Sequence, residues 1–174
     1  MSQVKEFAFY FLIYAFGGWL LENIYSLVRD GIFFKPNFLK SPIKPMYGIA
    51  PILLIYTTSQ NSHWLVIISL GLIIPTAVEY VTGVFLEKYS GKKWWDYSEL
   101  VGQVHGRICV GFSFCWIFLS LGLIYFLHPF IFSIYQHYSS AINWIIPFLI
   151  IFVIIDMLIS TFFQKAEGFV LNKH

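Results

Sequence analysis

Charged residues are scarce in this 174-residue sequence: Asp, Glu, Lys and Arg together make up 11% of it, against roughly 25% in an ordinary soluble domain. Apolar residues of the AVILMFWYC set make up 58%, and aromatic residues 21%. This balance excludes a soluble globular enzyme, a disordered protein and a nucleic-acid-binding module. It predicts that residues 1–174 form a single integral membrane domain of the all-α class, a bundle of transmembrane helices.

Standard catalytic motifs are also missing from the sequence. There is no P-loop, which excludes an ATPase activity of its own, and there is no HExxH, CxxC or GxSxG motif. We therefore expect neither a cofactor nor a resident metal ion, and the balance leans against an enzyme. The only two cysteines, Cys109 and Cys115, would lie on different faces of one helix, so we expect no disulfide between them.

Long apolar runs define five expected membrane spans. A helix needs about 20 apolar residues to cross the hydrocarbon layer. The second run is the weakest, because it is short and because Pro45 and Pro51 bracket its start. It either begins somewhat earlier or is broken near Pro51. The expected spans are 7–28, 45–59, 64–86, 107–127 and 142–163.

The basic residues are distributed unevenly over the connections between these spans. With five spans, ten of the eleven basic residues lie on one side of the membrane and Lys5 alone lies on the other. The positive-inside rule then places the N-terminus outside and the C-terminus in the cytoplasm. Without the second span, the two Lys-rich loops would lie on opposite sides and the asymmetry would vanish. The charge pattern therefore also favours five spans.

Three carboxylates fall inside the expected spans. An ionisable group there costs roughly 2.5–3.5 kcal/mol and is a candidate functional group. Glu22, Glu79 and Asp156 each precede the cytoplasmic end of their span by six or seven residues, a depth of about 10 Å. Small and polar residues continue the helix face of each acid, which predicts a polar cavity open to the cytoplasm. The alternative is that the acids only satisfy buried partners such as Arg107.

Five further residues are candidates for the same site. Glu87 continues the polar face of the third span, and Arg107 would act as a counter-ion. Asp96 lies among three aromatic residues, where it either caps a short interfacial helix or lines the mouth of the cavity. His105 would sit where the acids open to water, and Tyr47 belongs to the Pro-rich beginning of the second span.

Five short motifs follow one another along the chain. They are Gly18-Trp19 with Glu22; Pro42 and Pro45 with Met46-Tyr47-Gly48; Glu79-Tyr80 with Gly83 and Leu86-Glu87; Trp95-Asp96-Tyr97; and Gly106-Arg107-Ile108-Cys109. In these motifs, from about Gly18 to Trp116, the chain resembles the bacterial membrane proteins known as putative ABC-transporter type IV permeases. Ser41, Met46 and Gln103 depart from the pattern of that family.

The resemblance implies a multi-pass protein of the bacterial inner membrane that takes part in transport. Our leading hypothesis is a small transport-associated membrane subunit, in which Glu22, Glu79 and Glu87 line the cytoplasm-facing cavity. Its candidate partners are the lipid bilayer, a separate ATPase subunit and a second copy of the chain, but no nucleic acid. One alternative is a membrane-embedded enzyme acting on a lipid or phosphate-bearing head group at the inner leaflet. The other is a structural or assembly factor.

Overall fold

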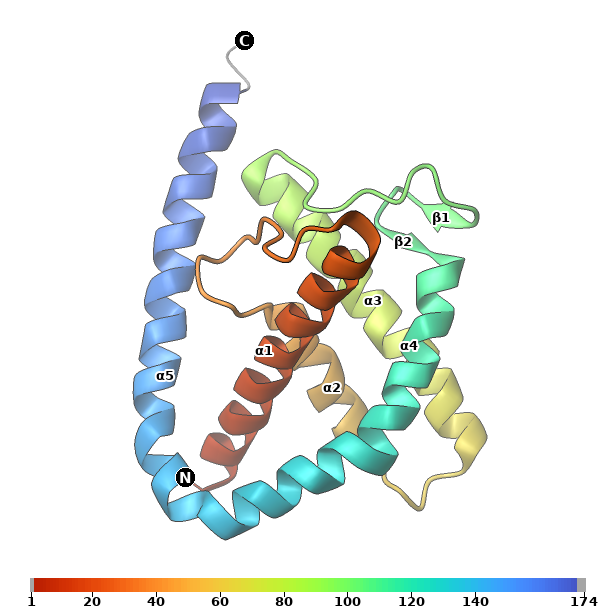
Figure 1. Cartoon of the computed structure of the whole chain (residues 1–174), viewed down its shortest axis with the longest axis vertical. Helices are drawn as coiled ribbons and strands as arrows, with labels where there is room; N and C mark the ends of the chain where they lie inside the picture. The colour runs from red at the N-terminus through yellow and green to blue at the C-terminus, as the bar shows by residue number, and fades with distance from the viewer. Residues whose placement is uncertain (1, 172–174) are drawn as a thin grey trace.

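The computed structural model describes residues 2–171, and it is predominantly helical (Figure 1). The all-α class is therefore confirmed. The β-structure in the described chain is a single antiparallel hairpin of two-residue strands. The elements are α1 (Ser2–Asp30), α2 (Pro45–Thr57), α3 (Trp64–Ser90), β1 (Gln103–Val104), β2 (Ile108–Cys109), α4 (Val110–Gly122), a π-helical turn η1 (Leu123–Leu127) and α5 (His128–Leu171).

The ends of these elements lie at two opposite ends of the molecule. Figure 1 shows the start of α1 at the lower end and the end of α5 at the upper end. Loop 31–44 and loop 91–102 with its hairpin both lie in the upper half, while the connection 58–63 lies at the lower end. The two Lys-rich loops therefore lie toward the same end of the molecule as the end of α5.

Three helical stretches are long and apolar enough to cross a membrane: Gln3–Asp30, Trp64–Ser90 and Val110–Gln164. The last one is 55 residues long and joins α4, η1 and α5 without a break. It forms a U in Figure 1, with two upright arms joined by a helical base. The sequence separates the arms as spans 107–127 and 142–163. The structure keeps the connection between them helical and kinks α5 at Tyr138 (φ −112°, ψ 15°).

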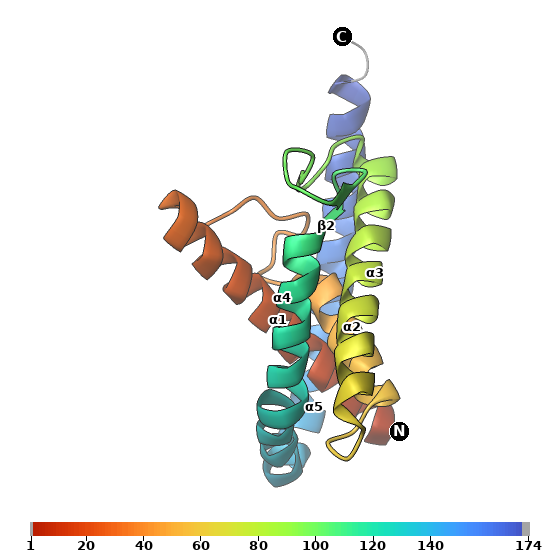
Figure 2. The same ribbon diagram turned by 90° about the vertical axis from the view of Figure 1, so that its right-hand side faces the viewer.

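Close packing of α1 against α2 depends on two glycines. A Cβ atom at Gly18 would collide with the ring of Tyr47, and one at Gly48 would come within 2.5 Å of the ring of Phe11. Small residues of this kind let two helix backbones approach closely inside a membrane. The upper part of α1 then leans away from the other helices, and loop 31–44 returns from it to the bundle (Figure 2).

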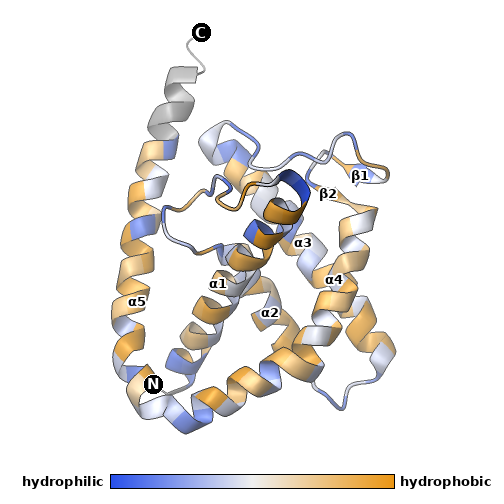
Figure 3. Ribbon diagram, in the orientation of Figure 1, coloured by the Kyte–Doolittle hydropathy of each residue, from blue (hydrophilic) through white to orange (hydrophobic). Residues whose placement is uncertain are grey.

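The outside of the helices is apolar, as expected for a surface that faces lipid. Phe118 and Phe162 are each 74% exposed and Trp144 is 78% exposed. Figure 3 shows hydrophobic colouring over most of the helices, with hydrophilic residues concentrated in the loops and at helix ends. Such a large exposed apolar surface would promote aggregation in water, but it suits the hydrocarbon interior of a bilayer.

Candidate functional site

Glu22 on α1 holds the loop that follows it. Its carboxylate lies 2.5 Å from Nζ of Lys44 and 3.5 Å from Nζ of Lys35, and it accepts a 3.3 Å hydrogen bond from the hydroxyl of Tyr47. The neighbouring Asn23 accepts the backbone N–H of Lys35 at 3.0 Å. Glu22 is therefore neutralised by two lysines, and α1 is fixed to the start of α2.

Glu79 on α3 is bound by neutral donors. It is 2% exposed and accepts the hydroxyl of Tyr97 at 3.0 Å and the indole N–H of Trp116 at 2.9 Å. No salt bridge joins it to a basic side chain within the described part of the chain. Burial and the nearby Glu79 carboxylate raise the pKa of Tyr97, so its hydroxyl keeps the proton that it donates.

The two acids are linked through a pair of aromatic rings. Tyr47, which binds Glu22, and Trp116, which binds Glu79, have ring centroids 5.8 Å apart. We call these residues the Tyr47–Trp116 pair. Through it, α1, α2, α4 and α3 are connected by one continuous series of polar and aromatic contacts.

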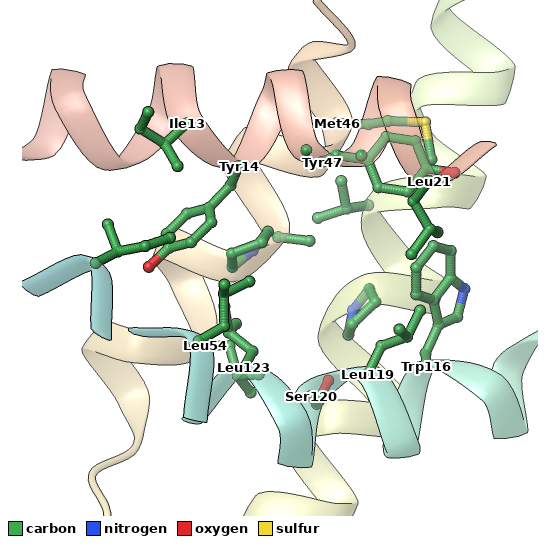
Figure 4. Close-up of a pocket in the computed structure, with 18 residues that line it drawn as sticks. Ile13, Tyr14, Leu21, Met46, Tyr47, Leu54, Trp116, Leu119, Ser120 and Leu123 are labelled. Atoms are coloured by element: carbon green, nitrogen blue, oxygen red, sulfur yellow. The ribbon is translucent and has the colours of Figure 1, made fainter. Parts of the chain in front are cut away.

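The Tyr47–Trp116 pair also forms one end of a pocket. The pocket has a volume of about 250 Å³ and lies between α1, α2, α3 and α4. Figure 4 shows the pair at one end of it and Tyr14 at the other. Most of the wall between them is aliphatic, including Leu54 and Leu119. Among the residues predicted from the sequence, Tyr47 is the one that lines this pocket. Glu22 and Glu79 do not line it, but they are hydrogen-bonded to Tyr47 and Trp116, which do.

Glu87 and Arg107 form an ion pair of their own. Two nitrogens of the Arg107 guanidinium, Nη2 and Nε, lie 2.7 and 3.1 Å from the same oxygen of Glu87. The β1–β2 hairpin places Arg107 there as the last of three connecting residues. His105 (φ 54°) and Gly106 (φ 70°) both take a positive φ, and the Arg107 N–H donates to the carbonyl of Val104 at 3.1 Å. His105 itself faces Tyr80, with its Nδ1 3.0 Å from the Tyr80 hydroxyl.

Asp96 shapes the loop that precedes the hairpin. It accepts the hydroxyl of Ser98 at 2.5 Å and the backbone N–H of Ser98 at 2.9 Å, and Nζ of Lys93 lies 3.3 Å away. These contacts, the Ser98 hydroxyl foremost, lower the pKa of Asp96. Asp96 therefore closes a turn within the loop, and no helix begins there.

Asp156 on α5 binds backbone rather than a cation. Its two oxygens accept the N–H of Ser41 at 2.8 Å and the N–H of Lys40 at 3.2 Å, and Ser160 adds a third bond at 3.1 Å. Each acid inside an expected span thus binds residues of a Lys-rich loop and holds that loop against the helices. Asp156 and Glu22 hold loop 31–44, and Glu79 holds the loop that follows α3.

The structure places six of the eight predicted residues in three separate groups, and leaves Asp96 with Ser98 and His105 with Tyr80. Glu22 and Glu79 share the Tyr47–Trp116 pair, Glu87 binds Arg107, and Asp156 stands on its own helix. Trp116 and Lys44 were missed as site residues, because a Trp in an apolar helix and a Lys in a basic loop carry no local signal. Among the described residues, no three His, Cys, Asp or Glu side chains gather as a metal site would require.

Comparison with known proteins identifies one family. A family model described as "Putative ABC-transporter type IV" matches residues 9–161, which is most of the chain. The chain belongs to this family. The match extends the motif-based resemblance in both directions and includes all eight predicted site residues. No curated protein and no solved structure matches the chain. This member of the putative ABC-transporter type IV family is, with its long apolar helices, a helical membrane protein.

Proposed function

We propose that this protein is the membrane subunit of a bacterial transport system and that the pocket between α1, α2, α3 and α4 holds the transported ligand. One observation carries the proposal. The Tyr47–Trp116 pair closes one end of the pocket, and each ring of the pair is hydrogen-bonded to a carboxylate inside the helices. A ligand that moves either ring therefore exchanges contacts with Glu22 or Glu79.

Movement of the Tyr47–Trp116 pair would give the pocket a polar exit. The present wall is mostly apolar and suits a ligand with an apolar body. Displacing the rings would uncover Glu22 and Glu79. The opening formed in this way would extend from the pocket toward the end of the molecule with the Lys-rich loops. A hydrogen bond to a charged group contributes about 1.5–3 kcal/mol. Breaking two of them is within the binding free energy of a micromolar ligand, about 8 kcal/mol.

The energy for transport would come from elsewhere, because the sequence has no nucleotide-binding motif. A separate ATPase subunit or an ion gradient would supply it. Loop 31–44 and the loop 91–102 with its hairpin are the surfaces that we assign to the ATPase, since both lie at the end of the molecule that carries most of the basic residues.

We further propose five membrane crossings, with the N-terminus outside the cell and the C-terminus in the cytoplasm. The helix α2 has 13 residues and spans about 20 Å, less than the roughly 30 Å of hydrocarbon. Loop 31–44 would complete this crossing, since Leu39 (3% exposed) and Ile43 (9% exposed) are buried. The placement of both Lys-rich loops at one end supports this topology.

A structural or assembly role is the competing function. It is favoured by the observation that Glu22, Glu79 and Asp156 each fasten a loop to the helices. In that role the pocket would be dispensable, whereas the anchoring acids would not. Filling the pocket alone would therefore abolish a transport function but leave a structural function intact.

The test fills the pocket without strain. Gly17 lines the pocket, and a Cβ atom there would have no neighbour within 4 Å. Gly111 on α4 has equally open surroundings but is not among the residues that line the pocket. We expect Gly17→Leu to fold as well as Gly111→Leu, yet to lose complementation of a deletion strain that Gly111→Leu retains. Equal complementation by two well-folded variants would overturn the transport function for this pocket.

The energy source is tested by native mass spectrometry. The protein is extracted from its native membranes in mild detergent, and the masses of any bound subunits are measured. A stoichiometric ATPase subunit is the expected result. Extraction of the chain alone, under conditions that keep other membrane complexes intact, would contradict the ATPase partnership and favour an ion gradient.

A further inference from the structure

A second pocket lies near the Lys-rich end of the molecule. It has a volume of about 320 Å³ and is formed by loop 31–44, α2, α3, α5 and the loop after α3. Its wall is largely apolar and contains the rings of Phe38, Trp94 and Trp95. Phe38 and Trp94 pack edge to face, with centroids 5.6 Å apart. Tryptophans gather where the bilayer meets water, so a pocket lined by them suits the level where a lipid chain meets its head group.

The polar edge of this pocket carries a net positive charge. Lys44 lines the pocket and, together with Lys35, binds the single carboxylate of Glu22. Two ammonium groups against one carboxylate leave a net charge of +1. An apolar pocket with a cationic edge complements a molecule that joins a hydrocarbon chain to an anionic group.

We propose that this pocket binds one acyl chain of an anionic phospholipid from the surrounding bilayer, with the phosphate beside Lys44 and Lys35. A free phosphate ion would leave the apolar wall uncovered, whereas a lipid covers it and pairs the surplus charge. The bound acyl chain would contact both loop 31–44 and α3, and would thereby stabilise the ion pairs of Glu22 with Lys35 and Lys44. This site is separate from the transport pocket, and its occupancy does not depend on the function proposed for that pocket.

Brominated lipids provide the measurement, because bromine on an acyl chain quenches nearby tryptophan fluorescence. Delipidated protein in detergent is titrated with phosphatidylglycerol or phosphatidylcholine brominated on the chain, and native mass spectrometry counts the bound lipids. We expect saturable quenching, one lipid per chain, and about fivefold tighter binding of phosphatidylglycerol, since one basic residue near the surface contributes about that factor. The Trp94→Phe, Trp95→Phe double variant should lose most of the saturable signal.

A pair of charge variants separates a built site from general attraction. Lys35→Gln removes the surplus charge at the pocket and leaves the Glu22–Lys44 pair intact. Lys93→Gln makes the same change at the same end of the molecule, but Lys93 pairs with Asp96, whereas Lys35 shares Glu22 with Lys44, which lines the pocket. We expect Lys35→Gln to abolish the preference for phosphatidylglycerol and Lys93→Gln to keep it. An equal loss in both variants, or no loss in either, would overturn the proposal.

The chain-binding part of the proposal has its own variant. Thr82 lines the pocket from α3, and Thr82→Phe would occupy the space of the acyl chain. Saturable quenching by both lipids should then disappear. If Thr82→Phe fails to fold, the comparison of Lys35→Gln with Lys93→Gln still decides the matter. Quenching that never saturates in the unmodified protein would also contradict a site for one lipid.

Discussion

The indole N–H of Trp116 donates to the carboxylate of Glu79 across 2.9 Å, although the two residues are 37 positions apart and belong to different helices. The same indole ring forms part of the wall of the pocket between α1, α2, α3 and α4. Glu79 is almost fully buried and has one other donor among the described residues, the hydroxyl of Tyr97. Any ligand that displaces Trp116 must therefore leave Glu79 with one of its two hydrogen bonds. The Trp116–Glu79 bond thus couples occupancy of the pocket to the packing of α3 against α4.

Removing the indole N–H should destabilise the protein. Trp116→Phe keeps an aromatic ring in the wall but leaves one oxygen of Glu79 without its donor. An unsatisfied buried group costs about 1–3 kcal/mol, so the thermal midpoint in detergent should fall. Trp64→Phe is the matched control, because Trp64 is 56% exposed, and it should leave the midpoint unchanged. Equal midpoints for the two variants would show that the Trp116–Glu79 bond contributes little.

Two adjacent glycines on α1 should respond oppositely to the same substitution. A Cβ atom at Gly18 collides with the ring of Tyr47, whereas one at Gly17 meets nothing within 4 Å. Gly18→Ala should therefore destabilise the protein by about 1–3 kcal/mol through overpacking. Gly17→Ala should stabilise it by about 0.5–1 kcal/mol, because alanine favours a helix over glycine. Thermal unfolding of both variants in one detergent checks the difference in sign.

The sequence was sufficient to predict the all-α class and roughly where the apolar helices form, because both depend on local composition. Long apolar runs fix where helices form, and the asymmetry of lysine and arginine predicts which loops share an end of the molecule. It also predicted that 128–141 connects two spans, but not that the connection is helical. The helix there continues through η1 and through the kink at Tyr138. The hydropathy of the sequence predicts neither the π-helical turn nor the kink.

The partners of the acids could not be predicted, because they depend on contacts between distant segments. Asp156 binds the backbone N–H of Ser41, 115 residues away, and backbone donors have no signature in a sequence. Arg107 was expected to balance several acids, yet the hairpin directs it to Glu87. The depth of Glu22 and Glu79 in the expected spans singled them out, and their functional role stays a prediction. Their connection through two aromatic rings required the fold.

Asp156 should control the protease resistance of loop 31–44. Its carboxylate accepts the N–H groups of Lys40 and Ser41, on either side of a bond that trypsin can cleave. Asp156→Ala removes both acceptors, so cleavage after Lys40 should become faster in detergent-solubilised protein. Asp30→Ala serves as control, because Asp30 is exposed and pairs only with its neighbour Arg29 in the described structure. If both variants are cleaved at the rate of the unmodified protein, Asp156 does not hold the loop.

Single cysteines should distinguish five crossings from fewer. In a background where Cys109 and Cys115 are serine, exposed positions are Phe34 (78%) in loop 31–44, Val101 (93%) in the loop after α3, and Asn61 between α2 and α3. With five crossings, a membrane-impermeant maleimide should label Asn61→Cys in intact spheroplasts, but should label Phe34→Cys and Val101→Cys only after lysis. If α2 does not cross, Phe34→Cys and Asn61→Cys should instead label together, on the side opposite Val101→Cys. The pairing of Phe34 with either Asn61 or Val101 therefore decides whether the short α2, completed by loop 31–44, spans the bilayer.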